Sequence, residues 1–191
     1  MKRFLLSMML VAVAIASTGC AAKGKKKWDD KDRRAVREEV RAYRDMAYLE
    51  NLAELEFEEF AGDVVGAIEI DYPIYTTFVE LPAKGDTVEV YVVSTIVNRL
   101  NADAHNMRNI YPYPWLVAEG ILPPNLDHQA QRAFYDCFAR KVRNYYPSIA
   151  AFFSAVVNDS STSMLTAMQE QCAADLFDWN IIIEEDVVVA N

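Results

Sequence analysis

The fold class depends on one stretch, Thr87-Val88-Glu89-Val90-Tyr91-Val92-Val93-Ser94-Thr95-Ile96-Val97, in which β-branched and aromatic residues dominate. In its first half, valines alternate with Glu89 and Tyr91. Alternation and β-branched side chains are typical of a half-buried strand, so we predict a strand over residues 87–97. A helix is the competing interpretation, because four apolar residues also recur at helical spacing: Val90, Val93, Val97 and Leu100.

The segments around this stretch favour a sheet. Residues 64–70 (VVGAIEI) and 74–81 (IYTTFVEL) are rich in strand-forming residues, and a cluster of turn formers follows them. A hairpin across that turn pairs 74–81 with 87–97, and residues 181–189 (IIIEEDVVV) can add another strand. The sequence therefore predicts an α+β fold, in which a small antiparallel sheet packs against several helices. If residues 87–100 are helical, the fold is mostly α instead.

Helical spacing accounts for the other elements. We expect one long N-terminal helix from Asp29 to Phe60, because this segment lacks proline and glycine and carries an apolar stripe, and Gly62 offers a stop. The clearest stripe predicts a helix over residues 126–145. We expect shorter helices at residues 98–108, at 115–119 before Gly120 and at 147–157 from Pro147, and a last apolar stripe predicts a helix over residues 164–176.

The N-terminus has the layout of an export signal. Met1-Lys2-Arg3 is basic, residues 4–16 are apolar except for Ser7, and small residues follow. The apolar run is too short to span a bilayer, which takes about 20 residues. With Ser17-Thr18-Gly19-Cys20 at its end, the segment resembles the signal peptide of bacterial lipoproteins, although Ser17 stands where that class usually has an aliphatic residue.

This resemblance implies cleavage between Gly19 and Cys20 and a diacylglycerol group on the Cys20 thiol. The mature protein is then held in the cell envelope by its lipid, and Ala21 after the cysteine implies sorting to the outer membrane. An ordinary signal peptide that leaves Cys20 unmodified, or removes it, is the alternative. The expected organisation is a lipoprotein signal peptide (1–19), a lipidated cysteine with a charged tether (20–34) and a single globular domain (35–191).

Charge is distributed unevenly. The tether carries lysines that can contact anionic lipid head groups, at about 1 kcal/mol each, although a solvated spacer is the simpler interpretation. These are Lys23, Lys25, Lys26 and Lys27. From Ala35 on, 25 acidic residues stand against 10 basic ones, a net charge of −15. Such a domain argues against nucleic acid as a partner and against lying flat on an anionic membrane, whereas an envelope protein is a partner that the charge allows.

Two cysteines remain in the domain, Cys137 and Cys172, each on the apolar face of a predicted helix. In an exported protein they can form a disulfide, but two buried thiols are an equal alternative. The sequence contains two histidines and no CxxC motif, so we expect no metal site and no cofactor.

Asp103, His105 and Arg108 share a short polar stretch, and Asp127-His128 is a second pair of an acid and an imidazole. An imidazole beside a carboxylate can act as a general base. The sequence has no nucleophile elbow, zinc-protease motif or phosphate loop to accompany it, so we predict no catalytic residue.

A row of like charges follows one predicted helix at Glu50, Glu54 and Glu58. Carboxylates four residues apart oppose a helix slightly, and a cation or a basic partner would relieve them. Three carboxylates on one helix rarely enclose a metal ion, so we interpret this row as a solvated face.

Aromatic residues gather in a proline-punctuated loop at Tyr111, Tyr113 and Trp115, shortly after His105. Such side chains can stack on a sugar ring or a peptide, and we treat these four residues as a candidate ligand surface. The competing interpretation is that the aromatic rings cap the core where the chain turns.

The sequence predicts a lipid-anchored cell-envelope lipoprotein whose domain works by non-catalytic binding or assembly. The alternative is an envelope enzyme or a protein that binds a small ligand such as a carbohydrate. A pocket that gathers the candidate ligand surface would favour the alternative, and a filled core with a flat surface would favour assembly.

Overall fold

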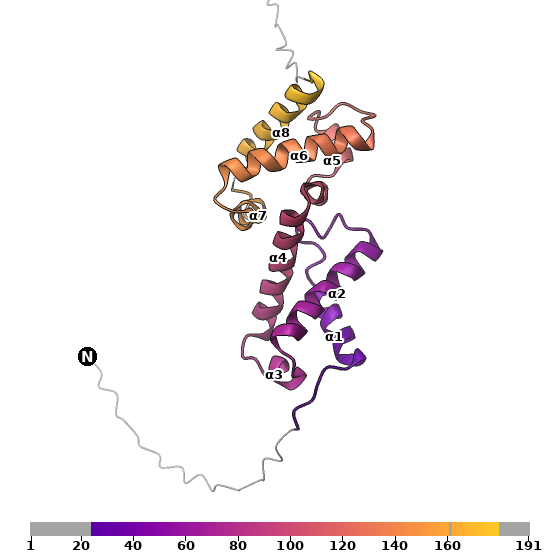
Figure 1. The fold of residues 1–191 in the computed structure, drawn as a ribbon, viewed down its shortest axis with the longest axis vertical. Coiled ribbons are helices and arrows are strands. Elements are labelled where there is room, and N and C mark those ends of the chain that lie inside the picture. The colour runs from indigo at the N-terminus through magenta and orange to yellow at the C-terminus, as the bar shows by residue number, and fades with distance from the viewer. Residues whose placement is uncertain (1–23, 161, 180–191) are drawn as a thin grey trace, which may run out of the picture.

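Helices are the regular elements of the computed structural model, which describes residues 24–160 and 162–179 (Figure 1). They are α1 (Asp30–Arg41), α2 (Glu54–Asp71), α3 (Tyr75–Val79), α4 (Lys84–Ala102), the 3-10 helix η1 (Ala104–Asn109), α5 (Tyr113–Ala118), α6 (His128–Tyr145), α7 (Ile149–Val157) and α8 (Thr162–Phe177). None of these helices combines the length and the apolar character needed to cross a membrane.

The predicted α+β fold with an antiparallel sheet is wrong: within the described residues there is no strand, and the protein is mostly α. Residues 64–70 continue α2, residues 74–81 contain α3, and residues 87–97 lie inside α4. An isolated bridge between Lys27 and Ile74 is the nearest approach to a sheet in this part of the chain. The strand expected at residues 181–189 lies outside the described residues.

Burial explains why α4 is a helix. Its buried stripe repeats every four residues, at Val88, Val92, Ile96 and Leu100. Val90, which a strand would place on the same face as Val88 and Val92, is 62% exposed. The helix therefore buries a different set of side chains from the one that alternation suggested.

The threonine of α4 behaves as helical threonines do. The Thr95 hydroxyl donates to the carbonyl oxygen of Tyr91, one turn earlier, at 2.8 Å. A β-branched residue costs a helix at most about 0.7 kcal/mol, whereas full burial of a valine or leucine side chain contributes about 1.5–3 kcal/mol. Tertiary burial of the stripe thus outweighs the local preference for a strand.

The single long helix expected from Asp29 to Phe60 is also wrong, because the chain folds back after α1. In the loop between α1 and α2, Arg44 donates to the carbonyl oxygens of Leu49 at 2.6 Å and Leu52 at 2.5 Å. Tyr48 is fully buried there with a positive φ of 81°. The reversal lets the apolar stripes of the two helices face each other.

Helix α2 continues past Gly62, where a stop was expected. Its buried positions continue at helical spacing on both sides of this glycine, from Phe57 to Ile68. A glycine inside a helix costs about 1 kcal/mol relative to alanine, which the burial along this stripe exceeds.

Ion pairs mark how α1 and α2 lie. Arg33, early in α1, contacts Glu69 at the end of α2 at 2.7 Å, while Arg41 at the end of α1 contacts Glu54 at the start of α2 at 2.9 Å. The two helices are therefore antiparallel.

Helix α4 joins the two ends of the molecule: α1 and α2 lie alongside it, α3 lies beside its start, and α5, α6 and α8 lie beyond its last turn (Figure 1). It packs antiparallel to α2, because Arg99 contacts Asp63 at 2.6 Å and the Tyr91 hydroxyl donates to Asp71 at 2.5 Å. The buried residues along these elements form one continuous core.

Aromatic rings fill the core around α6. Phe134 and Phe138, one turn apart, stack with their centroids at 6.3 Å, and Phe152 of α7 meets Phe138 edge-on at 6.4 Å. A disulfide joins Cys137 of α6 to Cys172 of α8, with the Cα atoms 5.9 Å apart. The C-terminal half is thus held by both aromatic packing and a covalent link.

Candidate functional site

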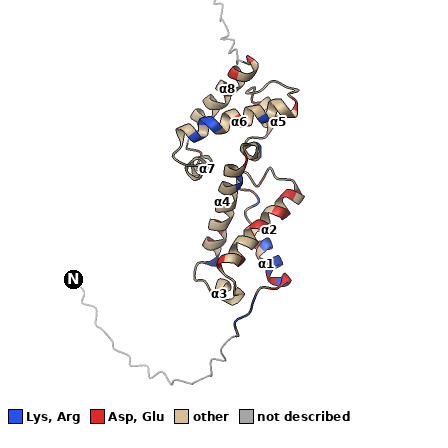
Figure 2. Ribbon diagram, in the orientation of Figure 1, with Lys and Arg blue, Asp and Glu red and all other residues tan. Residues whose placement is uncertain are grey.

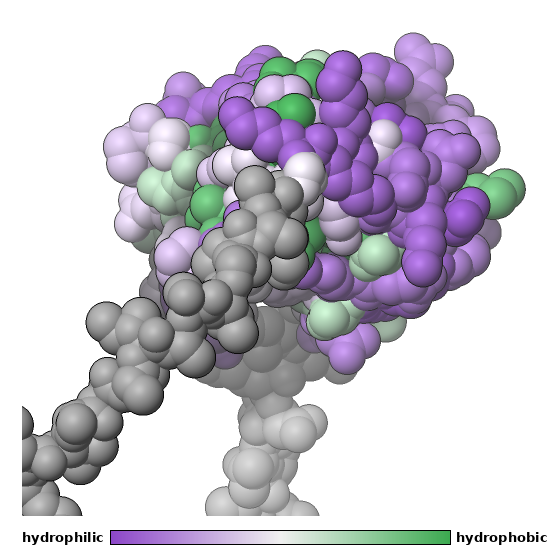
Figure 3. Space-filling model, turned by 90° about the horizontal axis from the view of Figure 1, so that it is seen from below, coloured by the Kyte–Doolittle hydropathy of each residue, from purple (hydrophilic) through white to green (hydrophobic). Residues whose placement is uncertain are grey.

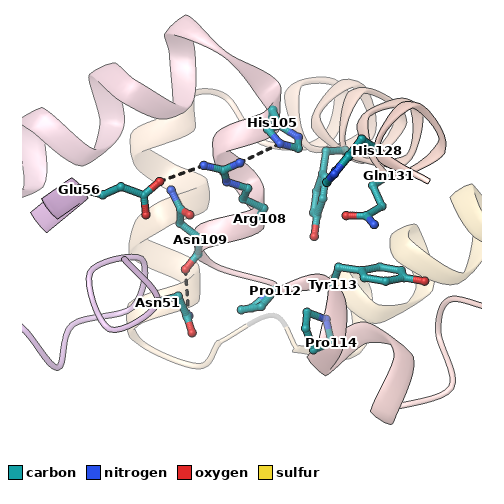
Figure 4. A pocket seen from close by; sticks show the side chains of 11 residues that line it. Asn51, Glu56, His105, Arg108, Asn109, Pro112, Tyr113, Pro114, His128 and Gln131 are labelled. Atoms are coloured by element: carbon teal, nitrogen blue, oxygen red, sulfur yellow. Dashed lines mark hydrogen bonds and ion pairs between the residues drawn. The ribbon is translucent and has the colours of Figure 1, made fainter. Parts of the chain in front are cut away.

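A pocket of about 410 Å³ opens where the chain passes from α4 through η1 and α5 to the start of α6 (Figure 4). The loop before α2 and the first turn of α2 close its other side. Its lining is Asn51, Glu56, His105, Arg108, Asn109, Pro112, Tyr113, Pro114, His128, Gln131 and Tyr135. Both histidines of the chain therefore line one pocket.

Helix caps place the two histidines. The Asp103 carboxylate accepts from the backbone amide of His105 at 2.9 Å and so begins η1. The Asp127 carboxylate accepts from the amide of Ala130 at 2.8 Å and so begins α6, in which His128 is the first residue. These two acids cap helices, which is a different role from the acid–imidazole pairs considered from the sequence.

One side of the pocket is a chain of polar contacts across elements. Arg108 donates from Nη2 to Glu56 Oε1 at 3.1 Å, and its Nη1 lies 3.0 Å from His105 Nε2 (Figure 4). Glu56 Oε2 in turn accepts from the backbone amide of Ala53 at 3.0 Å, at the start of α2. The contacts tie η1 to the beginning of α2 and hold the Arg108 guanidinium at the rim of the pocket.

The contact with Arg108 defines the state of His105. A guanidinium only donates, so His105 Nε2 accepts and the neutral ring carries its proton on Nδ1. Burial lowers the pKa of His105, and the positive charges of Arg108 and Arg132 lower it further. At neutral pH this imidazole is uncharged, and the electron pair on Nε2 accepts the hydrogen bond from the Arg108 guanidinium.

Amide side chains supply the remaining polar groups. Asn51 donates from Nδ2 to the carbonyl oxygen of Asn109 at 3.0 Å, and Gln131 donates from Nε2 to the carbonyl oxygen of Leu126 at 2.8 Å. Within the described residues, neither side-chain oxygen has a hydrogen-bond donor. Asn109 is only 5% exposed, and no described residue hydrogen-bonds to its side-chain amide.

The two tyrosines of the pocket present rings rather than hydroxyl groups. The Tyr113 hydroxyl donates to the carbonyl oxygen of Pro123 at 2.9 Å and accepts from the amide of Leu126 at 2.8 Å. The Tyr135 hydroxyl donates to the carbonyl oxygen of Tyr111 at 2.8 Å, and burial raises its pKa. Both hydroxyls are thereby occupied by backbone groups, which leaves the rings as apolar walls.

The structure divides the candidate ligand surface. Tyr113 and His105 line the pocket, whereas Tyr111 and Trp115 do not. Tyr111 packs edge-on against Phe138 at 5.6 Å and lies 5.7 Å from Trp115, and burial raises the pKa of its hydroxyl. Tyr111 therefore caps the core, as the competing interpretation had it, and Trp115 lies partly exposed beside it.

Sequence reasoning did not find the side of the pocket made by Asn51 and Glu56, or Gln131 of α6. Glu56 is the third residue after Ala53, the N-cap of α2. A glutamate at this position commonly accepts a hydrogen bond from the backbone amide of the cap residue. That signal identifies a helix start and gives no indication of a pocket.

The glutamate row has an internal partner. Arg41 of α1 contacts both Glu54, at 2.9 Å, and Glu58. Two of the three carboxylates are thus compensated by an arginine of the same chain. The described part of the chain contains no group of three or more potential metal ligands.

Cys20, the predicted site of lipid attachment, lies outside the described residues. The chain matches none of the protein-family models, curated proteins or solved structures with which it was compared.

Proposed function

We propose that this protein is a lipid-anchored binding module of the cell envelope, whose pocket at η1 and α6 takes a small neutral polar ligand of the saccharide class. Its anchor is the Cys20 lipid implied by the N-terminal segment, and the helical domain carries the pocket. The proposal covers non-covalent binding and assigns no catalytic residue.

One observation carries the ligand class: the Asn109 amide. No described residue hydrogen-bonds to this amide, and it is not a buried unpaired group, so it is open to the pocket; a ligand group that replaces water there and pairs with it contributes about 0.5–1.5 kcal/mol. A side-chain amide can donate and accept hydrogen bonds, and a sugar hydroxyl can also do both, so the two groups can pair in either direction. The unpaired oxygens of Asn51 and Gln131 add acceptors for hydroxyl donors nearby.

The charge of the lining supports a neutral ligand. Arg108 and Glu56 compensate each other, and His105 is uncharged at neutral pH because its pKa is lowered. The half-buried ring of Tyr113 offers a flat apolar surface of the kind on which sugar rings stack, and Tyr135, which is 1% exposed, lies behind it in the lining. A volume of about 410 Å³ is within the usual range for small-molecule sites.

Calorimetric titration with neutral disaccharides, maltose and cellobiose, tests the ligand class, with glucuronate as a charged comparison. We expect saturable binding of a neutral sugar that Gln131→Leu weakens about tenfold, the effect of one lost hydrogen bond in a buried site. Gln129→Leu is the matched control, because Gln129 is exposed on the same helix and does not line the pocket. Equal effects of the two variants, or binding of glucuronate alone, would refute the proposal.

Mass spectrometry of the mature N-terminus tests the anchor independently. A diacylated Cys20 as the first residue is expected, and the Cys20→Ala precursor should lose membrane attachment. An unmodified N-terminus at any other residue would contradict the anchor and leave the pocket proposal standing.

A further inference from the structure

Charge is divided between the two ends of the described chain. Residues 24–44 contain nine basic and five acidic residues, whereas residues 45–179 contain seven basic and 20 acidic residues. Figure 2 shows the basic residues along α1 and along the chain that leads into it. The positive part of an otherwise acidic protein therefore lies where the N-terminal segment joins the domain.

Five of these basic side chains form what we term the basic surface: Lys25, Lys27, Lys31, Arg34 and Arg37. All five are exposed, and none has an ion-pair partner among the described residues. All four carboxylates of α1 are already paired with basic side chains other than these five. Asp30 contacts Arg33 at 3.1 Å, and Glu38 contacts Arg41 at 3.5 Å.

A shallow groove of about 240 Å³ lies within the basic surface. It is lined by Asp30, Arg33, Arg34 and Arg37. Arg33 is held by both carboxylate oxygens of Glu69, at 2.9 and 2.7 Å, so it shapes the groove and is not available to a ligand. Arg34 and Arg37 remain available, and a guanidinium pairs with phosphate oxygens through two parallel hydrogen bonds.

The position of the basic surface along the chain limits its distance from the anchor. Cys20 and Asp29, the cap of α1, are separated by nine residue steps, which span at most about 30 Å when fully extended. Lys27 is paired through its backbone with Ile74, so the entering chain is fixed to the domain at that point. The basic surface is consequently the part of the domain that the anchor keeps closest to the membrane.

We propose that the basic surface docks on the phosphate-bearing head groups of anionic phospholipids in the membrane to which Cys20 attaches the protein. This orientation rests on the proposed anchor. The docked domain directs its acidic remainder away from the membrane. The overall charge of −15 from Ala35 on had argued against membrane contact, but that sum conceals the separation of charge along the fold.

The contact is electrostatic. Figure 3 shows the end of the molecule at which the chain enters, and hydrophilic residues dominate the part not covered by grey atoms. The apolar areas visible there are small and separated, unlike the continuous face of a helix that inserts among acyl chains. Each basic residue near an anionic surface strengthens binding by about fivefold, and salt weakens it.

Vesicle sedimentation of the mature chain tests the docking without the anchor. The chain begins at residue 20 with Cys20→Ser and therefore keeps every buried residue of the described part, the first of which is Trp28. Binding is measured at low salt to two kinds of vesicle. One contains phosphatidylcholine alone, and the other contains phosphatidylcholine with roughly 30% anionic phosphatidylglycerol.

We expect binding to the anionic vesicles only, reduced by at least about 25-fold in Arg34→Glu/Arg37→Glu, since two contacts of about fivefold each are lost. Arg140→Glu/Arg143→Glu is the matched control: both residues are exposed on α6, and the charge change is the same. Thermal melting of both variants verifies folding, and Arg34→Gln/Arg37→Gln separates lost attraction from added repulsion.

Three results would overturn the proposal: equal losses in the α1 and α6 variants, no preference for anionic vesicles, or release by inorganic phosphate at constant ionic strength, which assigns the groove to a free anion. The chain in this binding assay carries no lipid on residue 20, so its result does not depend on the anchor. Mass spectrometry of the mature N-terminus tests the anchor separately.

Discussion

The indole Nε1 of Trp28 donates a hydrogen bond to the carbonyl oxygen of Tyr72 at 2.7 Å, across 44 positions of sequence. The same ring meets Tyr75 edge-on with the centroids 4.9 Å apart and lies 5.5 Å from Phe78. Trp28 is 8% exposed, so a residue expected within the charged tether belongs to the core. This contact fixes the entering chain against the corner between α2 and α3.

Trp28→Ala should destabilise the protein by about 3 kcal/mol, the lower part of the range for a buried tryptophan, because this site lies at the edge of the core. Trp28→Phe keeps most of the packing and loses the hydrogen bond, so about 1 kcal/mol is expected. Urea unfolding measures both. Trp115→Ala is the control, since Trp115 is 41% exposed, and a loss as large as that of Trp28→Ala would contradict the assignment of Trp28 to the core.

Val92→Ala should cost about 1–3 kcal/mol, because Val92 is fully buried in the stripe of α4. Val90→Ala should change stability by less than about 0.5 kcal/mol, since Val90 is 62% exposed and alanine favours a helix. The two residues share a face in a strand but not in a helix, so chemical denaturation of the pair distinguishes the two structures. Equal costs would support the strand.

Reduction of the link between Cys137 and Cys172 should lower stability by about 2–4 kcal/mol, because the disulfide closes a loop of 35 positions. Peptide mapping without reductant establishes the bonded state first, and thermal melting with and without reductant then measures the effect. The double variant Cys137→Ala/Cys172→Ala should melt at the same temperature in both conditions. Free thiols at both positions in the mapping would refute the bond.

Protonation of His105 should destabilise the fold as the pH falls. Burial holds its folded pKa below the ordinary value of 6.5, so the unfolded chain binds the proton more readily. The contribution to stability is complete above pH 6.5 and is lost as the pH falls from there through the folded pKa. Unfolding measured from pH 7.5 to 5 should show a smaller decline in His105→Gln than in the parent, and parallel curves would contradict this prediction.

An element could be predicted from the sequence when the residues that specify it are neighbours in the chain. The helix over residues 126–145 corresponds closely to α6, because Asp127 caps it and its apolar stripe is continuous within one segment. The prediction of one long helix from Asp29 to Phe60 was wrong because the chain reverses after α1. Hydrogen bonds from Arg44 to the carbonyl oxygens of Leu49 and Leu52 hold this reversal, and the segment contains no glycine or proline that would predict it.

The sequence likewise predicted only those residues of the candidate site that lie close together in the chain. His105 and Tyr113 stand near each other in sequence and share one pocket in the structure. Tyr111 does not line the pocket, because its ring packs against Phe138. Asn51 and Gln131, 80 positions apart, meet at the pocket only after α1, α2, α4 and α6 have packed.

By itself, the sequence determined the features that depend on neighbouring residues, namely the capped helix α6 and the acidic surplus after Ala35, and it predicted an export signal at the N-terminus. The tertiary structure alone decided that residues 87–97 are helical, because β-branched residues follow whichever conformation buries them, and the partners that bury Val88 and Val92 lie elsewhere in the chain. It also decided the pocket and the separation of charge. Both are properties of distant residues brought together by a shared core.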